Sequence, residues 1–323
     1  MKKPPDKKPP ATTLASRRQF LGAGTRLAVA ASLSVGTLGA FTRAAQATMA
    51  PEIKPIELAP GFTLLDGAGC NVLALKGAQG SLLVDGGYAR NARTLLAAAA
   101  KATGNRKVAR LFNTHWHPAQ TGSNETVGRD GGLIIAHEVT RLYLSRPVAS
   151  TDYEGLYGPL TEKARPSIVT RSTGAMAFAE HPVEYGYLPA AHTNGDLYIH
   201  FPAANILVAG GPVCAEAWPL LDWRNGAWLG GLVKAHEKLV SLVRPDTCIV
   251  PANGRVLTGA ELRQHHQMYV AFHEKMVAYQ NRGFDSGDCI ADKPLKAHEA
   301  QFGDATRFIH GAFQSLNLAY SPD

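Results

Sequence analysis

The sequence predicts an α/β protein whose main part folds as one layered domain. Short apolar runs typical of β-strands alternate with longer stretches typical of helices from residue 61 onward, and no linker interrupts them midway. The chain has 323 residues, of which 45% are hydrophobic and 18% are charged. That composition supports a sizeable buried core and excludes a disordered or fibrous chain.

The first half of this domain begins with short strands, and helices enter afterwards. Gly61 precedes the first strand as a turn residue, and residues 77–80 join two apolar runs as in a hairpin. The alanine-rich stretch 89–103 ends at Gly104, which is typical of a helix C-terminus. We expect strands at residues 62–65, 71–76, 81–84, 108–112 and 133–136, and helices at residues 89–103 and 137–144.

In the second half of the domain, predicted strands and helices alternate again after an interval without periodicity. Residues 145–170 show no periodicity and are predicted to form a long loop or insertion. Beyond them, we expect strands at residues 176–179, 183–188, 197–201, 206–209 and 248–250, and helices at residues 228–243 and 259–282.

Residues 1–47 have the three parts of a secretory signal. A pair of arginines at 17–18 stands before a mildly apolar stretch at 27–40, and a small-x-small sequence ends at Ala47. Paired arginines before Phe-Leu are typical of twin-arginine signals, which a receptor reads. We therefore predict transport by the twin-arginine export machinery, cleavage after Ala47, and a periplasmic or otherwise exported bacterial protein.

A membrane anchor is the alternative interpretation of the same segment. Only 16 residues lie uncharged between Arg26 and Arg43, fewer than the roughly 20 that a spanning helix needs. We therefore expect no stable membrane insertion. After the signal peptide, the proline-bearing stretch 48–60 is predicted to be a linker, and residues 61–323 are predicted to form the single domain.

The net charge of +7 comes entirely from the N-terminal segment. Residues 1–47 hold eight basic side chains and one acidic side chain, whereas the remainder of the chain holds 25 of each kind. A nucleic-acid-binding domain would carry a basic surface of its own. We therefore expect a small-molecule substrate and no nucleic-acid partner.

The four cysteines do not form a recognisable metal or redox motif. Cys70, Cys214, Cys248 and Cys289 are spaced unlike a zinc ribbon or a CxxC pair. Exported proteins can form disulfides, but three of the four lie in apolar, strand-like contexts. For those three we expect buried free thiols.

Three histidines follow strand ends in a pattern that indicates a metal site. His115 and His117 come directly after the strand at 108–112, and His192 lies in a polar turn between two later strands. Loops at strand ends can aim side chains at one point. Three imidazoles form the ligand set of an open zinc site, whose fourth position is left for water or substrate. The alternative is that these are polar loop histidines on a scaffold that has lost its metal.

Four motifs in order along the chain resemble those of the metallo-β-lactamase fold superfamily. They are Leu83-Val84-Asp85-Gly86-Gly87, Thr114-His115-Trp116-His117 with Thr121-Gly122-Ser123-Asn124, His192-Thr193-Asn194-Gly195-Asp196, and Val250-Pro251-Ala252-Asn253-Gly254. The resemblance covers nearly all of the domain. It implies a four-layer αβ/βα sandwich with a metal site at one edge, where His115, His117 and His192 are the ligands of the first metal.

The sequence departs from the family pattern at the positions of the second metal. Where the family's second motif continues with Asp and His, this chain has Ala119 and Gln120. Gly211 stands where the bridging aspartate is expected, and Asn253 stands where the last motif has histidine. We therefore expect one metal ion, zinc with iron as the alternative, and a lost second site.

Three further polar residues are candidates for catalytic work. Gln120 and Asn253 can hydrogen-bond a water or a substrate carbonyl, although neither can act as a base near neutral pH. Asp85 is either a carboxylate that orients a histidine or a water, or a turn residue before two glycines. Asp196 has the same two interpretations, with the structural one favoured. The negative charge of Glu125 is expected to stabilise the N-terminus of a helix.

Other aromatic and histidine residues are given simpler interpretations. Trp218, Trp223 and Trp228 either wall an apolar substrate pocket or pack in the core. His265 and His266 are expected on the solvated face of the last long helix.

Together these observations predict an exported mononuclear zinc hydrolase. It would attack an ester, lactone, thioester or amide carbonyl with metal-bound hydroxide, which zinc supplies near neutral pH. A non-catalytic ligand-binding protein on the same fold is the alternative. An iron-dependent sulfur dioxygenase ranks lower, because by resemblance it needs the aspartate that Gly211 replaces. β-Lactamase activity also ranks lower, because neither familiar two-metal site survives intact. Phosphodiester cleavage ranks lower because it depends on paired metals.

Overall fold

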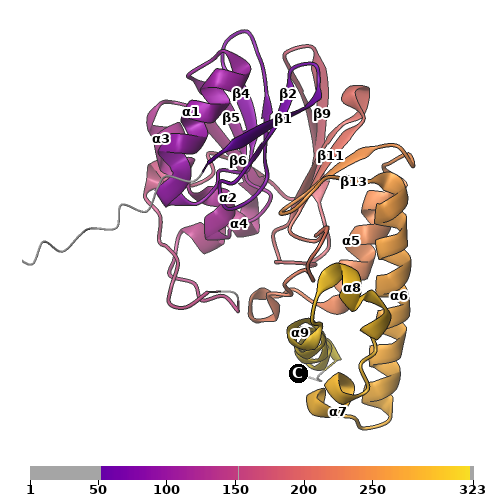
Figure 1. The fold of residues 1–323 in the computed structure, drawn as a ribbon. Helices are drawn as coiled ribbons and strands as arrows, with labels where there is room; N and C mark the ends of the chain where they lie inside the picture. The colour runs from indigo at the N-terminus through magenta and orange to yellow at the C-terminus, as the bar shows by residue number, and fades with distance from the viewer. Residues whose placement is uncertain (1–51, 152, 321–323) are drawn as a thin grey trace, which may run out of the picture. The chain divides into compact units, whose positions relative to one another are not determined.

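Two β-sheets pack face to face, with helices on their outer faces (Figure 1). The computed structural model describes residues 52–151 and 153–320. These residues lie in the compact unit that spans residues 49–323. The predicted signal peptide at 1–47 and its cleavage site fall outside the described residues. The layering within the unit is the predicted four-layer αβ/βα sandwich, so the predicted fold class is confirmed.

The first sheet runs in chain order, with seven strands in the described residues. Its early strands pair antiparallel up to β4, and from β4 to β7 the pairing is parallel. The strands are β1 (Lys54–Ala59), β2 (Phe62–Asp66), β3 (Val72–Leu75), β4 (Ser81–Val84), β5 (Val108–Phe112), β6 (Leu133–His137) and β7 (Ile168–Thr170).

The second sheet has six strands among the described residues, in the order β13-β12-β11-β10-β9-β8. β11 and β12 are parallel, and the other neighbours are antiparallel. The strands are β8 (Thr173–Phe178), β9 (His181–Tyr187), β10 (Leu197–Phe201), β11 (Ile206–Gly210), β12 (Cys248–Pro251) and β13 (Leu257–Thr258).

Alternation of apolar side chains along the strands builds the layers. In β4, Leu82 and Val84 join the cluster between the two sheets, whereas Leu83 joins the cluster under α1 (Ala92–Thr103). Successive side chains of a strand point to opposite faces, so a strand that is apolar throughout is covered on both faces. The continuous apolar runs of the sequence therefore come from strands buried between two layers.

Helices close both outer faces of the sandwich. α1 and α3 (Asn124–Arg129) cover the first sheet, and α5 (Leu229–Ser241) and α6 (Gly259–Asn281) cover the second. α9 (Thr306–Tyr320) packs on α5 and α6. α6 starts with a capping box, in which the Thr258 hydroxyl and the Glu261 carboxylate each accept the other's backbone N–H. The shorter α-helices are α2 (Pro118–Thr121), α4 (Glu138–Leu144), α7 (Ser286–Ala291) and α8 (Glu299–Phe302).

The stretch predicted as a linker contains a strand, which corrects the predicted boundary at residues 48–60. β1 pairs antiparallel with β2, and Lys54 lies opposite Asp66. β1 is the edge strand of its sheet and pairs with β2 alone. Proline has no backbone N–H, and an edge strand tolerates this because no second strand pairs with it. The proline-rich composition therefore concealed an edge strand.

The C-terminal region adds structure that the sequence analysis did not assign. α7, α8 and α9 follow α6, and α9 buries Phe308, Ile309 and Leu316 in the core over the second sheet. His265 on α6 is also buried, with its ring 5.2 Å from that of Phe302. The expectation that His265 lies on a solvated face is therefore wrong, because the helices after α6 cover that face.

Most other predicted elements are present, with ends that differ by a few residues. The expected long loop at 145–170 contains the 3₁₀ turn Glu162–Ala164 and the whole of β7. All four cysteines are described, and none forms a disulfide. Among the described residues, no helix combines the length and apolarity needed to cross a membrane.

The topology brings several strand ends to one edge of the sandwich. β4 and β5 are parallel, so Asp85 and His115 follow neighbouring strands at the same edge. β11 and β12 are also parallel, so Gly211 and Asn253 follow those strands side by side. The loop that carries His192 lies between β9 and β10. The motifs found in the sequence are thus adjacent in space.

Candidate metal centre

His115, His117 and His192 converge on one point at this edge. His192 Nε2 lies 3.1 Å from His115 Nε2 and 3.0 Å from His117 Nδ1. All three side chains are buried. They form the one cluster of three or more metal-ligating side chains within residues 52–151 and 153–320. The three residues that the sequence singles out as ligands are therefore brought together.

Two of the rings are oriented by hydrogen-bond acceptors on the side away from the cluster. These acceptors are a carbonyl oxygen and a carboxylate, which cannot donate a hydrogen bond. His192 Nδ1 lies 2.8 Å from the carbonyl oxygen of Leu220, and His117 Nε2 lies 3.1 Å from Oδ2 of Asp222. Each of these ring nitrogens must therefore donate its proton. The nitrogen on the other side of each ring is then unprotonated and faces the cluster.

The third ring is oriented through a relay that includes Asp85. His115 Nδ1 lies 3.0 Å from the hydroxyl of Thr114, which donates to Asp85 Oδ2 at 2.9 Å. The backbone N–H of Thr114 donates to Asp85 Oδ1 at 2.8 Å. Asp85 is buried at a positive φ of 68°, and burial raises its pKa to about 7 against the two hydrogen bonds. Asp85 is thus both a turn residue and a carboxylate that positions His115 through Thr114.

This donor set suits a divalent metal ion. Three ring nitrogens with inward lone pairs repel one another unless a cation lies among them. Protonation does not relieve the repulsion at His115, because burial, and then the neighbouring His192 and His117, hold its pKa well below the usual value. Imidazole nitrogen is a preferred ligand of zinc and of several other divalent metals. The residues present therefore fit such an ion.

Asp222 belongs to the site and was not singled out in the sequence. Its buried carboxylate accepts from Ser150 Oγ at 3.1 Å, Thr151 N at 3.3 Å and Asn225 Nδ2 at 2.9 Å, besides His117. Burial by itself would raise the pKa of Asp222, but the bond and charge of His117 and the other hydrogen bonds hold it below its usual value. In the sequence, Asp222 is marked only as an acidic residue within an apolar stretch. Its partner, His117, lies 105 positions earlier, so no local pattern joins the two.

Asp196 shapes the loop that carries the third ligand. Its Oδ2 accepts the backbone N–H of His192 at 2.7 Å and that of Thr193 at 2.9 Å, and its Oδ1 accepts the Thr193 hydroxyl at 2.6 Å. Burial raises the pKa of Asp196 even though these bonds oppose the shift. The geometry supports the structural interpretation of this residue.

Gly211 lies directly against the His192 ring. A Cβ at position 211 would lie 2.1 Å from Cδ2 and 2.7 Å from Nε2 of His192. No side chain fits at that distance, and the ring is held from its other edge by Leu220. A side chain at position 211, where the sequence analysis expects the bridging aspartate, would thus overlap the ring of a candidate metal ligand.

A cavity of about 380 Å³ opens over the histidines, and both predicted amide residues line it. Gln120 is buried on α2, whereas Asn253 is exposed at the rim. In the amide orientation that satisfies both ends, Asn253 Nδ2 donates to the backbone oxygens of Gly69 and Ala252. The two amides thus come from segments that follow strands of different sheets, β5 and β12.

Further residues line the same cavity without having been predicted there. Cys214 and Glu216 follow β11, and Tyr153 comes from the loop at 145–170. The Tyr153 ring lies edge-on to His117, with centroids 6.1 Å apart. Trp218 lines the cavity and also packs on the helical core, so both interpretations offered for the tryptophans apply to it.

Comparisons with known proteins agree with this geometry. The sequence model of the Metallo-beta-lactamase superfamily matches residues 65–269, and the chain therefore belongs to that superfamily. The fold is similar to that of a metallo-β-lactamase from Pontibacter korlensis, with a TM-score of 0.55 and 18% identity, over 68% of this chain and 99% of that one. It is also similar to the DIM-1 metallo-β-lactamase, with a TM-score of 0.54 and 16% identity, over 68% of this chain and 97% of that one. No curated protein sequence matches the chain.

These findings establish the class of protein. Membership of the superfamily implies a metal-dependent hydrolase, and the histidine triad supplies the ligands for a divalent metal. At identities of 16–18% the likeness to the solved structures concerns the fold. The residues after 269, including α7 to α9, lie beyond the matched segment.

Proposed function

We propose that this protein is an exported hydrolase that uses one zinc ion to cleave an ester, lactone, thioester or amide. The observation that carries the proposal is the triad of inward-facing histidine nitrogens, each fixed from behind. The positions that would complete a second metal site hold Gln120, Gly211 and Asn253, which are poor metal ligands or have no side chain to offer.

The chain's own residues have separable roles in this proposal. When bound, a divalent metal at such a triad polarises a carbonyl group and activates water. Asp222 and the Leu220 carbonyl keep two rings in the orientation that binds metal. The Gln120 amide can donate a hydrogen bond to a carbonyl substrate, whereas Asn253 uses its Nδ2 on Gly69 and Ala252 and keeps its Oδ1 to accept from a water. Neither amide takes up a proton near neutral pH. A substrate with a good leaving group is therefore favoured.

The first test is the metal content of protein purified without chelator or affinity-column metal. About one zinc per chain, measured by mass spectrometry, supports the proposal. Iron in place of zinc favours the dioxygenase, and no metal after zinc is added back favours the binding protein.

The second test is a panel of ester, lactone, thioester and amide substrates. His117→Ala should lose both the metal and all turnover, whereas His266→Ala, on α6 and outside the cavity, should keep both. Hydrolysis that survives in His117→Ala would exclude this mechanism. Thermal stabilisation by a ligand without any turnover would instead identify a binding protein.

Export is tested separately from catalysis. The chain expressed with residues 1–47 should reach the periplasm in a host with a twin-arginine system and should lose those residues there. Intact mass of the exported protein checks cleavage after Ala47. Replacing both arginines at 17–18 by lysine should retain the chain in the cytoplasm, and export of that variant would contradict the twin-arginine assignment.

A further inference from the structure

A second cavity of about 520 Å³ adjoins the metal cavity. Ala217, Trp218 and Leu220 line both cavities and so form the partition between them. The far wall of the second cavity comes from residues 302–311 of α8, α9 and the turn between them. These residues lie beyond the segment 65–269 that the family model matches. The cavity is therefore closed on one side by residues outside the matched family segment.

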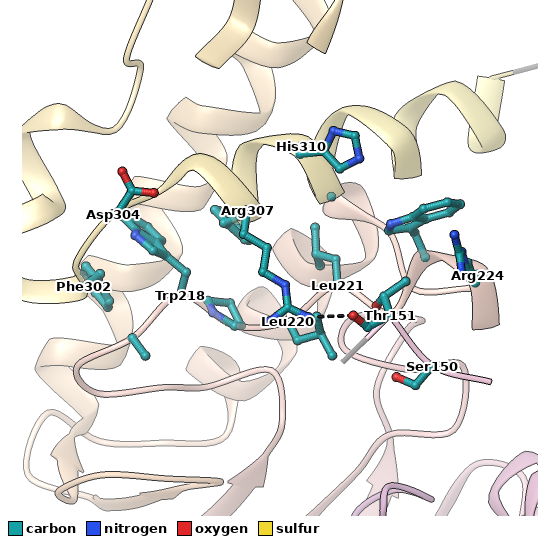
Figure 2. Close-up of a pocket in the computed structure, with 15 residues that line it drawn as sticks. Ser150, Thr151, Trp218, Leu220, Leu221, Arg224, Phe302, Asp304, Arg307 and His310 are labelled. Carbon is teal, nitrogen blue, oxygen red and sulfur yellow. Dashed lines mark hydrogen bonds between the residues drawn. The ribbon is translucent and has the colours of Figure 1, made fainter. Parts of the chain in front are cut away.

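The lining of the second cavity combines apolar surface with positive charge. Trp218 stacks on Phe308 with ring centroids 5.2 Å apart, and further apolar lining comes from Leu221 and Trp223. Figure 2 shows Arg307 reaching across from α9, with Asp304 and Phe302 at one end of the cavity and Arg224 at the other. Among the described residues of this lining, Asp304 is the one carboxylate, and it accepts the backbone N–H of Thr306 at 3.0 Å. Such a lining complements a ligand with an apolar body and an anionic end.

A chain of hydrogen bonds links Arg307 to the metal centre. Arg307 Nη2 donates to the carbonyl oxygen of Thr151 at 2.6 Å (Figure 2). The backbone N–H and the hydroxyl of Thr151 both donate to Oδ1 of Asp222 at 3.3 Å. Asp222 in turn orients His117. The backbone of residue 151 is thus bonded to the arginine of one cavity and to the carboxylate that serves the other.

The partition provides a second link. The Leu220 side chain lines both cavities, while its carbonyl oxygen accepts from His192 Nδ1 at 2.8 Å. Residues 220–222 therefore orient two of the three metal-binding rings. A ligand packed against Leu220 and Leu221 would press directly on this segment.

We propose that the second cavity binds an amphipathic carboxylate and that its occupancy changes the affinity of the histidine triad for metal. The carboxylate end pairs with the Arg307 guanidinium, which offers five N–H donors, and this pairing shifts the bond from Arg307 to the Thr151 carbonyl. The apolar body packs against Trp218, Leu220 and Leu221. Coupling of this kind is reciprocal, so the metal changes the affinity for the carboxylate by the same factor. The inference goes beyond the proposed hydrolysis and requires no turnover.

Binding is tested with three probes that share one alkyl chain. Octanoate, octanol and octylammonium are titrated by calorimetry into the zinc-treated full chain. Octanoate should bind at one site and about tenfold more tightly than octanol, and octylammonium should bind least, as the charge of the lining requires. Equal affinity for octanoate and octanol would overturn the proposal.

Variants assign the binding to this cavity. Arg307→Gln should remove the preference for octanoate, and Arg307→Lys should restore part of it because the charge returns without the planar fork. Arg263→Gln, which removes an exposed arginine of α6 outside both cavities, should behave like the natural chain. Octanoate bound directly to the metal would be insensitive to Arg307→Gln, and that result would overturn the proposal.

Coupling is tested by the affinity for zinc, measured by competition with a chromophoric chelator with and without saturating octanoate. We expect a change of about threefold or more, which disappears in Arg307→Gln. Equal zinc affinity in both conditions, or no zinc binding at all, would overturn the coupling. Coupled binding of octanoate and zinc in a chain that hydrolyses no panel substrate would reject the proposed function and leave this inference standing.

Discussion

At the scale of single residues, the metal centre depends on side chains that do not touch the metal position. Asp222 fixes the proton of His117, the Leu220 carbonyl fixes that of His192, and the Thr114–Asp85 pair positions His115. Partners of this kind set the tautomer and the direction of a metal-binding ring. The strength of the centre is therefore distributed over residues that are far apart in the sequence.

Asp222→Asn is the direct test of this orientation. The amide keeps the shape of the carboxylate but loses its charge, so His117 Nε2–H loses a charged acceptor. We expect the affinity for zinc to fall by about 10- to 100-fold, measured by chelator competition. Asp246→Asn, which alters an exposed carboxylate paired with Arg244, serves as the control. Unchanged affinity in Asp222→Asn would show that His117 is held by its packing alone.

Gly211→Ala tests the contact beneath His192. The new methyl group would lie 2.1 Å from the ring and must displace it from its bond to Leu220. We expect a loss of zinc affinity of at least about tenfold, as is typical when support of a ligand is removed. Gly287→Ala on α7, where a Cβ meets only the Asp285 carboxylate at 3.1 Å, is the matched control. Full zinc affinity in Gly211→Ala would mean that the ring can shift without cost.

The candidate site could be predicted only as far as local patterns reach. His115, His117 and His192 stand in motifs at strand ends, and such motifs are visible in a sequence. Asp222 stands in no motif, and its partner is chosen by the fold of residues 145–170 and 217–222. Periodicity carries no information about contacts of this kind, which is why Asp222 and the second cavity emerge only from the structure.

At the scale of elements, the helices over the second sheet bury two histidines between α5 and α6 and their neighbours. His236 is fully buried, its Nδ1 lies 3.0 Å from the Leu232 carbonyl, and its ring contacts that of Tyr269 at 4.8 Å. Burial lowers the pKa of His236 to about 3 and that of His265 to about 4. Both rings are therefore neutral in the folded protein at mildly acidic pH.

This burial makes the helical layer sensitive to acid. A histidine in the unfolded chain titrates near pH 6.5. Below that pH, His236 and His265 are protonated in the unfolded chain but stay neutral in the folded chain. The stability contributed by the neutral rings is present above pH 6.5 and is lost as the pH falls towards 4. Metal-free His236→Phe should lose less unfolding free energy between pH 7.5 and pH 5 than the natural chain, as measured by urea titration. Parallel losses in the two proteins would place the acid sensitivity elsewhere.

The elements themselves were predictable where local chemistry marks them. The helix at 89–103 ends at Gly104 with a positive φ of 73°, and the apolar runs became strands. β1 was hidden by prolines that only its position at the edge permits. His265 was misplaced because exposure on a helix depends on what packs against it, and α8 and α9 come later in the chain.

At the scale of the whole molecule, metal binding and folding should be linked. The triad is assembled from the two halves of the sandwich, so only the folded chain presents all three nitrogens together. Zinc at about a hundred times its dissociation constant should raise the unfolding free energy by about 2.7 kcal/mol. Thermal melts with zinc and with chelator measure the difference, and His117→Ala should show no such shift. A melting temperature of the natural chain that is the same with zinc and with chelator would contradict this linkage.

The contact between Gly211 and His192 also constrains how this protein can change by mutation. Any codon change that replaces the glycine adds a Cβ where the imidazole now lies. An aspartate introduced there to recruit a second cation to the proposed mononuclear centre would therefore displace the ring of His192, a candidate ligand of the first. The gain at one position is conditional on a compensating shift at the other, which is a case of strong epistasis. A binuclear centre is thus not one substitution away, and a laboratory evolution experiment should reach it only through variants that relocate the ring first or change both positions together.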